Sequence, residues 1–418
     1  MHERSFQARL EEAIGLARAI DLTVVQSSIV PLAEIRPANY IGKGKVDEIA
    51  GLVKSLEIGL VVLDCALSPV QQRNLEKAWS AKVLDRTGLI LEIFGQRAHT
   101  REGALQVEHA HLTYQKGRLV RSWTHLERQR GGFGFLGGPG ETQLESDRRI
   151  IEERLARIET ELERVKKRRQ LHRESRARVP YPIAALVGYT NAGKSTLFNR
   201  LTQASVLQAD MLFATLDPTL RAVSLPNGLK IIVSDTVGFI SDLPTMLVAA
   251  FRATLEEVIE ADVILHVRDV AHEDSEAQAR DVVEVLRELD IKAEDPRLIE
   301  VWNKIDLLDA PRRTQLTNTA TRQAPDRRPV LLSAMTGEGI ERLAEAIENR
   351  LSRHRVVFDL LLDPADGAGV SWLYRHGEVI AKSMRPDGHL ALTVRVDAAK
   401  AGLVQSRFGS FAVPSSSP

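Results

Sequence analysis

The stretch that decides the fold is Gly188-Tyr189-Thr190-Asn191-Ala192-Gly193-Lys194-Ser195, which has the form G-x-x-x-x-G-K-S. An apolar run at residues 183–187 precedes it and predicts a short buried strand, and residues 196–201 predict a helix. This context of strand, loop and helix distinguishes a phosphate-binding loop from a glycine-rich turn. The glycines let successive backbone N–H groups turn toward an anion at the start of a helix. The stretch therefore predicts a phosphate site.

Four more segments follow in the chain order typical of guanine nucleotide-binding proteins, most of them at or just after the end of a predicted strand. They are Phe213-Ala214-Thr215-Leu216-Asp217, Asp235-Thr236-Val237-Gly238, Asn303-Lys304-Ile305-Asp306 and Ser333-Ala334. Each segment alone occurs often by chance. All five in this order indicate a GTPase of the Ras-like phosphate-loop class.

The predicted roles in phosphate binding follow from side-chain chemistry. Lys194 is expected to reach the β- and γ-phosphates, and the N–H groups of Thr215 and Gly238 to contact the γ-phosphate. The hydroxyls of Ser195 and Thr215 are the predicted ligands of Mg²⁺, with Asp235 holding the ion through water. We therefore expect GTP as the substrate and Mg²⁺ as the cofactor, with Lys194, Thr215 and Gly238 as the catalytic set.

The two last segments predict recognition of the guanine base. The carboxylate of Asp306 can accept hydrogen bonds from both N1–H and N2–H of guanine, a donor pair that adenine lacks. The N–H of Ala334 is expected near guanine O6. The residue after Gly238 is Phe239, where many GTPases carry a glutamine that orients the attacking water. Phenylalanine can neither donate nor accept, so we expect slow intrinsic hydrolysis that a partner accelerates.

Composition bounds the remaining function classes. The chain has 418 residues, is 44% hydrophobic, and carries 56 basic and 56 acidic side chains. This balance gives no global signature of polyanion binding, so any nucleic-acid surface must be local. The single cysteine, Cys65, excludes an internal disulfide and fits a reducing compartment. No apolar run approaches the ~18 residues of a membrane span, and the N-terminus does not resemble a secretion signal. We expect a cytoplasmic monomer.

The first 98 residues predict a small parallel α/β domain, because strand and helix patterns alternate. Predicted strands lie at residues 22–25, 58–63 and 83–85, and predicted helices at 6–20, 46–56, 69–79 and 87–95. The turn Gly42-Lys43-Gly44-Lys45 precedes one helix and could bind an anion there. It lacks a full nucleotide fingerprint, so an ordinary cationic turn is the alternative.

Residues 99–179 predict two long helices packed antiparallel, joined by a glycine-rich loop at 131–140. Apolar residues recur seven apart in residues 105–119 and in a heptad seam over 144–165. The second helix ends in the basic run Lys166-Lys167-Arg168-Arg169, followed by Arg173, Arg176 and Arg178. Such a run is often only a solvated helix end. Phe133 and Phe135 in the loop instead favour contact with RNA, because aromatic rings stack on bases.

The remaining residues predict two more units. Residues 180–353 form the predicted GTPase domain, with strands expected at 183–187, 220–225, 229–234, 263–267, 298–302 and 331–334. Residues 354–418 predict a small α+β domain with strands at 356–362, 378–383 and 389–396, and helices at 370–374 and from 398. The tail Pro414-Ser415-Ser416-Ser417-Pro418 is expected to be disordered.

The motifs together resemble the HflX family of GTPases over nearly the whole chain. The resemblance is carried by the five segments above, by Gly137-Gly-Pro-Gly-Glu-Thr-Gln-Leu-Glu-Ser-Asp-Arg-Arg, and by Leu67-Ser-Pro-Val-Gln-Gln-Arg-Asn-Leu-Glu and Asp85-Arg-Thr-Gly-Leu-Ile-Leu near the N-terminus. It implies a translational GTPase that binds the large (50S) ribosomal subunit. The resemblance further implies an ability to separate stalled or idle ribosomes and, in some members, a role in ribosome assembly.

Two function hypotheses remain open. The first is a GTP-hydrolysing ribosome factor whose GTP or GDP state switches its hold on the large subunit, with rRNA contacts through the glycine-rich loop and the basic helix. The alternative is an RNA-binding or RNA-remodelling protein that GTP regulates, with ATP used at the N-terminal domain. The resemblance keeps the alternative open, because some members of the family use ATP through that region. The sequence contains no second phosphate-binding loop, which favours the first.

Overall fold

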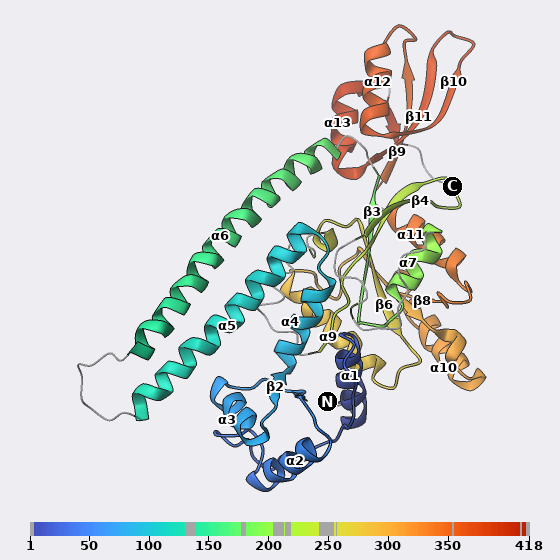
Figure 1. Cartoon of the computed structure of the whole chain (residues 1–418). Coiled ribbons are helices and arrows are strands. Elements are labelled where there is room, and N and C mark those ends of the chain that lie inside the picture. The colour runs from blue at the N-terminus through green and yellow to red at the C-terminus, as the bar shows by residue number, and fades with distance from the viewer. Residues whose placement is uncertain are drawn as a thin grey trace.

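The computed structural model describes residues 4–129, 139–176, 181–203, 213, 219–241, 255, 257–352, 355–409 and 412–414. Figure 1 shows a central sheet with helices around it, a long helical pair on one side, and separate N- and C-terminal units at opposite ends. The predicted fold class, α/β with a central phosphate-loop domain, is confirmed.

The N-terminal unit contains a two-stranded parallel sheet flanked by helices. Its elements are α1 (Phe6–Arg18), α2 (Lys43–Ser55), β1 (Leu60–Leu63), α3 (Pro69–Trp79), β2 (Lys82–Asp85) and α4 (Arg86–Arg97). Local signals set the helix starts: Ser68 and Gln71 form a capping box at α3, and the Asp85 side chain accepts the Gly88 N–H at α4.

The expected strand at residues 22–25 is wrong. These residues form no helix or strand, and Val25 is 58% exposed. A β-rich sequence becomes a strand only where a neighbouring strand offers backbone partners, and β1 pairs with β2 alone.

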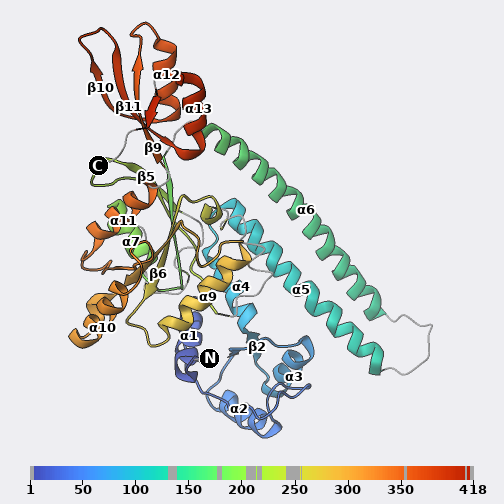
Figure 2. The ribbon, with the colours of Figure 1, turned by 180° about the vertical axis from the view of Figure 1, so that it is seen from behind.

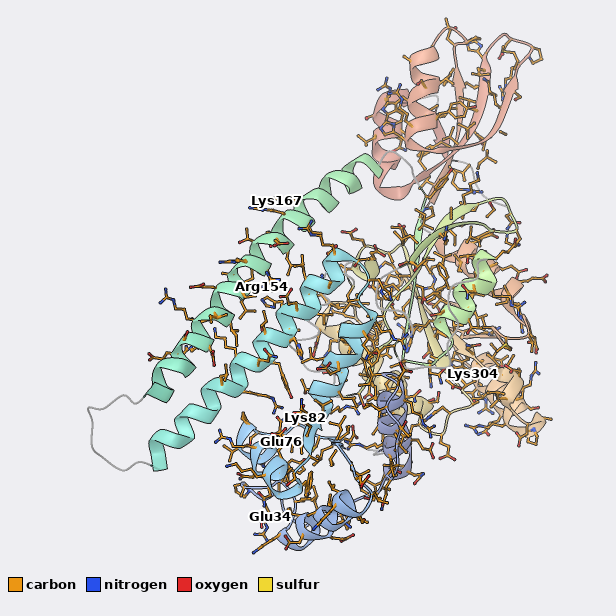
Figure 3. All side chains as sticks on the ribbon, viewed as in Figure 1. Glu34, Glu76, Lys82, Arg154, Lys167 and Lys304 are labelled. Carbon is orange, nitrogen blue, oxygen red and sulfur yellow. The ribbon has the colours of Figure 1, made fainter. Side chains whose placement is uncertain are left out.

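Two long helices confirm the predicted helical pair. Helix α5 spans Arg101–Gln129 and α6 spans Pro139–Arg176, and Figures 1 and 2 show them running alongside each other. Leu155 and Ile158 of α6 are buried, as are Leu105 and Val107 of α5. Arg154, seen on α6 in Figure 3, donates to both carboxylate oxygens of Glu108 across the pair, at 2.7 and 2.9 Å. Residues 130–138, and with them most of the glycine-rich loop, lie outside the described residues.

The central unit is a six-stranded sheet in the order β4-β5-β3-β6-β7-β8, parallel except for β4, which is antiparallel to β5. The strands are β3 (Ile183–Gly188), β4 (Thr219–Ser224), β5 (Lys230–Asp235), β6 (Val263–Asp269), β7 (Leu298–Asn303) and β8 (Val330–Leu331). The helices are α7 (Lys194–Thr202), α9 (Ser275–Glu288), η1 (Ile305–Leu307), α10 (Ala310–Thr321) and α11 (Ile340–Ser352). Strand β3 lies between β5 and β6, so the loop after it opens at a switch point of the sheet.

One hydrophobic core joins the N-terminal unit to one face of this sheet. Leu16 of α1, Phe94 of α4 and Val107 of α5 belong to the same buried cluster as Val187 of β3 and Val282 of α9. A second cluster, with α7 and α11, covers the opposite face. Helices α1, α4 and α5 therefore pack as part of the body of the central unit, and α2 and α3 have a smaller core with β1 and β2. The domain boundaries at residues 98, 179 and 353 stay predictions.

The C-terminal unit confirms the expected small α+β fold. Its elements are β9 (Arg355–Leu362), α12 (Gly367–His376), β10 (Glu378–Met384), β11 (Leu390–Asp397), α13 (Ala398–Phe408) and β12 (Ala412–Pro414). The strand order β10-β11-β9-β12, antiparallel throughout, is that of a split β-α-β-β-α-β unit. Pro414 pairs with Phe358 in β12, so the expectation of disorder is wrong there, and residues 415–418 lie outside the described part. Of the helices described, none has the length and hydrophobicity needed to cross a bilayer.

Helix pairing gives the first testable prediction. Ile158 is 1% exposed between α5 and α6, whereas Ile150, two turns earlier on α6, is 60% exposed. Ile158→Ala is expected to cost about 2–5 kcal/mol of local stability, because it leaves a cavity in a packed seam. Hydrogen exchange of the α6 amides measures this. The control, Ile150→Ala, is expected to change protection little. Equal effects of the two substitutions would contradict the packing described here.

A buried histidine in β6 gives the second prediction. His266 is 2% exposed, and its Nε2 has no hydrogen-bond partner among the described residues. Burial, with the charges of Arg268 and Lys194, lowers the pKa of His266 to about 3 from its ordinary 6.5. Between pH 6.5 and about 3 the histidine is therefore protonated in the unfolded chain and neutral in the folded one. The free energy of unfolding falls as the pH falls below 6.5.

The size of this effect can be measured by urea denaturation. Between pH 7 and pH 5 the histidine should account for a loss of about 2 kcal/mol in the free energy of unfolding. His266→Asn removes the titrating group, so the variant is expected to lose about 2 kcal/mol less than the wild type over the same interval. An identical pH dependence in both proteins would assign the acid sensitivity to other groups.

Candidate functional site

The loop after β3 has a backbone that only glycine allows at two points. Gly188 has φ +154°, and a Cβ there would lie 2.2 Å from the carbonyl oxygen of Val267. Gly193 has φ +91°, and its Cβ would lie 2.2 Å from Nδ2 of Asn303. Both positions are left-handed and crowded, so the two glycines are required by geometry. Helix α7 begins directly after the loop, at Lys194.

Lys194 is a buried cation inside this loop. It is 6% exposed, and its Nζ donates a hydrogen bond to the carbonyl oxygen of Tyr189 at 2.9 Å. Burial lowers the pKa of Lys194 to about 8, and the charge of Asp235 opposes that shift. A buried ammonium group beside a turn of inward N–H groups is suited to bind an anion.

Two of the three predicted magnesium ligands lie together. The Ser195 hydroxyl at the start of α7 donates to Oδ2 of Asp235 at 2.7 Å, and Asp235 is fully buried at the end of β5. Hydroxyl and carboxylate oxygens are the donor set that Mg²⁺ prefers, so these residues fit the ion that the sequence predicts. The third ligand, Thr215, lies outside the described residues, as do Ala214, Leu216 and Asp217.

The segment after Asp235 runs along the loop. Phe239 donates its N–H to the Gly188 carbonyl at 3.1 Å, and its own carbonyl accepts the Thr190 N–H at 2.7 Å. At Gly238 an added Cβ would lie 2.9 Å from the Thr190 Cα and 3.0 Å from Nζ of Lys194. Gly238 therefore lies directly against the loop and beside the lysine, and the contact of its N–H with a γ-phosphate stays a prediction.

The side chains of several predicted residues are structural. Phe239 is 1% exposed and belongs to the core shared with the N-terminal unit. Phe213, also buried in that core, packs edge-to-face against Phe94 of α4 with ring centroids 4.7 Å apart. Thr236 donates its hydroxyl to the Leu186 carbonyl at 2.6 Å. Val237 is also buried in the shared core.

Asn303 connects the phosphate loop to the predicted base-binding loop. Its Nδ2 donates to the Ala192 carbonyl at 2.8 Å, and its Oδ1 accepts the Ala334 N–H at 2.9 Å. The sequence placed this N–H near guanine O6, whereas in the structure Asn303 engages it. Ser333 is fully buried beside it, and its hydroxyl accepts the Thr336 N–H at 3.1 Å.

The next residues set the edge of this loop. Lys304 has φ +66°, and its Nζ lies 2.8 Å from a carboxylate oxygen of Asp269; Figure 3 labels its position. Ile305 is buried, whereas Asp306 is exposed in η1. An exposed carboxylate at this edge is accessible to a planar base.

One side chain of the site was missed by sequence reasoning. Arg200 of α7 donates from Nε to the Ala334 carbonyl at 3.1 Å and from its guanidinium to the Met335 carbonyl, so it connects the phosphate-loop helix to the base-binding loop. Arg200 belongs to no recurrent spacing, so the sequence carried no signal for it. Tyr189 was predicted as part of the phosphate loop, but its hydroxyl donates to Glu12 of helix α1 in the N-terminal unit.

Comparison with known proteins assigns the whole chain. Four family descriptions match in succession: GTP-binding GTPase N-terminal over residues 7–95, GTP-binding GTPase Middle Region over 97–176, 50S ribosome-binding GTPase over 183–304, and HflX C-terminal domain over 319–417. Among solved structures, the chain is similar to a GTP-binding protein from the archaeon Sulfolobus solfataricus in complex with GDP. The identity is 25% and the TM-score 0.44, covering 82% of this chain and 95% of that one.

Curated relatives are more similar. The GTPase HflX of Magnetococcus marinus is 48% identical over 398 residues, which cover 95% of this chain and 89% of the relative. The GTPase HflX of Escherichia coli is 49% identical over 362 residues, covering 86% and 83%. With its loops arranged around Lys194 and up to 95% of its length matched by relatives nearly half identical, this chain belongs to the HflX family of GTPases and is an enzyme that hydrolyses GTP.

Proposed function

We propose that this chain is a ribosome factor that binds the large (50S) subunit in its GTP form and separates stalled or idle ribosomes, or assists ribosome assembly. It acts as a monomer in the cytoplasm, where ribosomes are found. The observation that carries the proposal is the match of residues 183–304 to the 50S ribosome-binding GTPase description, over the same residues whose loops converge on Lys194.

In this proposal the phosphates of GTP bind over Gly188–Ser195, with Lys194 at the β- and γ-phosphates and the Gly238 N–H at the γ-phosphate. Ser195, Thr215 and Asp235 hold Mg²⁺, whose charge neutralises the phosphate oxygens. The contact between Ser195 and Asp235 supports this assignment, because it brings two oxygen donors to the mouth of the loop.

The base lies against Asp306 at the exposed edge of the sheet. Asn303 and Arg200 hold the surrounding loop from inside, through the Ala192 and Ala334 backbone. Their contacts leave the Asp306 carboxylate exposed, which supports its role in reading N1–H and N2–H of guanine.

Exchanging the base-reading residue tests the nucleotide assignment. Asp306→Asn replaces an acceptor by a donor, so GTP affinity is expected to fall by about 1–3 kcal/mol while xanthosine triphosphate affinity rises. Calorimetry with both nucleotides measures the change. Lys194→Ala is the companion variant and is expected to lose binding of both. If Asp306→Asn leaves GTP affinity unchanged and gains no affinity for the xanthine nucleotide, Asp306 does not read the guanine base.

Contact with ribosomal RNA is proposed through the glycine-rich loop and the basic end of α6. Each glycine costs backbone entropy to order, and contacts with a partner can offset that cost. Phe133 and Phe135 can stack on unpaired bases, and the arginines beside them can meet phosphates. At the alternative surface, Lys45 of the Gly42–Lys45 turn pairs with Glu48 of its own helix at 2.6 Å, as in an ordinary cationic turn.

Ribosome dependence of hydrolysis tests the partner. Because Phe239 cannot position water, large subunits are expected to accelerate GTP hydrolysis by roughly 10³–10⁵-fold. Changing both Phe133 and Phe135 to Ala is expected to leave GTP binding intact but weaken co-sedimentation with subunits and reduce the acceleration. Tyr374→Ala, at an exposed aromatic of α12, is the control and should match wild type. Equal hydrolysis rates with and without subunits would contradict the ribosome role.

A further inference from the structure

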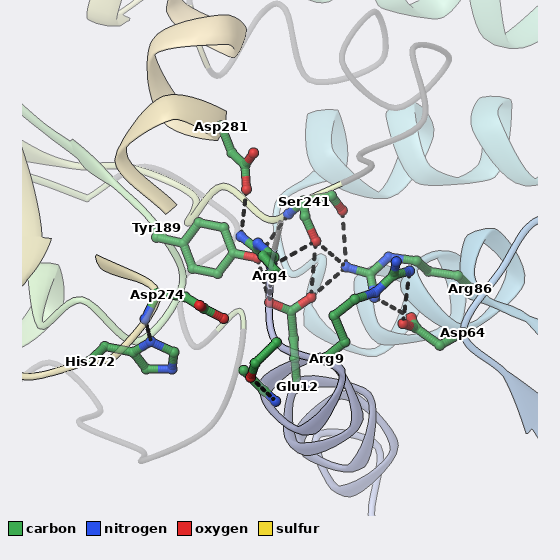
Figure 4. A network of polar contacts seen from close by, with 12 residues as sticks. Arg4, Arg9, Glu12, Asp64, Arg86, Tyr189, Ser241, His272, Asp274 and Asp281 are labelled. Carbon is green, nitrogen blue, oxygen red and sulfur yellow. Dashed lines mark hydrogen bonds and ion pairs between the residues drawn. The ribbon is translucent and has the colours of Figure 1, made fainter. Parts of the chain in front are cut away.

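A polar cluster joins the N-terminal unit to the two segments that contact the γ-phosphate in the proposed site (Figure 4). Its centre is Ser241, three residues after Gly238. The Arg86 guanidinium of α4 donates to the carbonyl and the hydroxyl of Ser241, both at 3.0 Å. Arg4 donates to the same hydroxyl at 3.0 Å. The chain leaving Gly238 is therefore held by two cations of the N-terminal unit.

The Tyr189 hydroxyl completes the connection from the phosphate loop. It accepts the Ser241 N–H at 2.9 Å and donates to the carboxylate of Glu12 on α1. Glu12 in turn accepts from Arg86 at 2.6 Å and from Arg4 at 3.1 Å. One carboxylate of α1 thus contacts, directly or through one group, both the loop that holds Lys194 and the segment that follows Gly238.

Burial gives these contacts a fixed geometry. The side chains of Arg86 and Glu12 are 6% and 10% exposed, so neither charge can turn to water. Burial alone would raise the pKa of Glu12, but Arg86, the Tyr189 hydroxyl and Arg4 together lower it, which keeps the carboxylate charged. Phe239 and Ile240, between Gly238 and Ser241, are each 1% exposed in the core shared with α1 and α4. Residues 239–241 are therefore fixed both by the hydrogen bonds of Ser241 and by the burial of Phe239 and Ile240.

We propose that Glu12, Arg86 and Tyr189 are positioning residues that favour GTP over GDP, because they hold Gly238 beside Lys194 before the nucleotide binds. Only a triphosphate has the γ-phosphate that the Gly238 N–H contacts, so only GTP gains from a segment that is already ordered. GDP binds the phosphate loop without this contact. The inference rests on the proposed function, since it takes guanine nucleotide to bind at Lys194.

By thermodynamic linkage, the nucleotide must also affect the docking of the N-terminal unit. If docking of α1 favours GTP by some factor, binding of GTP stabilises the docking of α1 by the same factor. The nucleotide state is then communicated to the N-terminal unit through Tyr189 and Ser241. Backbone amides of α1 are expected to exchange more slowly with a non-hydrolysable GTP analogue than with GDP.

The test compares nucleotide affinities in variants of the full chain. Tyr189→Phe removes only a hydroxyl and keeps the carbonyl that Lys194 uses, and Glu12→Gln keeps shape while removing charge. Each is expected to lower the ratio of GTP-analogue to GDP affinity by about tenfold, within the ~5–150-fold typical of coupled sites. Because Glu12 lies on α1, outside the nucleotide site, GDP affinity in Glu12→Gln should stay within about twofold of wild type. Combined, they should show less than additive loss, because Tyr189→Phe removes and Glu12→Gln weakens the same hydrogen bond.

A matched control separates positioning from the loss of a charge on α1. Glu11, the residue before Glu12, is exposed and accepts a hydrogen bond from Gln7 at 3.0 Å, so Glu11→Gln makes the same substitution on the same helix and should leave the ratio unchanged. An unchanged or raised ratio in Tyr189→Phe and Glu12→Gln would overturn the inference, as would equal losses of GDP and GTP-analogue affinity. Failure of the wild type to bind either nucleotide would instead refute the proposed site itself.

Discussion

The arrangement of this protein depends on neutralising one buried guanidinium. Arg86 is 5% exposed, and a charge removed from water in this way requires hydrogen-bonding partners on all sides. Its acceptors are Glu12 on α1, Asp64 at the end of β1, and the backbone and hydroxyl of Ser241 in the central unit. They come from three separate stretches of chain, so the arginine holds the N-terminal unit against the central unit. The neighbouring apolar core then packs around that placement.

Because of this placement, the N-terminal helices form part of the hydrophobic core of the central unit. Helices α1, α4 and α5 cover a face of its sheet, and Phe94 of α4 packs against Phe213 at the end of the stretch that leads to Thr215. A GTPase sheet needs helices on both faces, because parallel strands are apolar on both sides. Here part of that cover comes from residues earlier in the chain than the phosphate loop. Separating the units would expose core as well as break ion pairs.

Sequence reasoning found the parts of the site that a fixed backbone geometry demands. Gly188 and Gly193 can be recognised in the sequence, because only glycine tolerates their backbone φ angles and the close contact with neighbouring atoms. The contact between Glu12 and Tyr189 spans 177 positions and uses a carboxylate on an ordinary amphipathic helix, which looks in sequence like a solvated charge. At residues 22–25 the sequence predicted a strand that the structure lacks. Strand propensity is a local property, whereas a strand also needs a partner strand to pair with. Phosphate-loop motifs can therefore be recognised in a sequence, whereas ion pairs between distant parts of the chain cannot.

The length of α5 has a mechanical consequence. Its 29 residues rise about 1.5 Å each, so the helix is a rod of roughly 43 Å, and a connection at residues 98–100 joins its base to α4, the helix that carries Arg86. A rod converts rotation at its base into translation at its far end in proportion to its length. A tilt of about 5° at the base moves the far end by about 4 Å, roughly the rise of two to three helical residues. A rotation of α4 too small to disturb the sheet would therefore be amplified, by the length of α5 alone, to a shift of several ångströms at the far end of the helix.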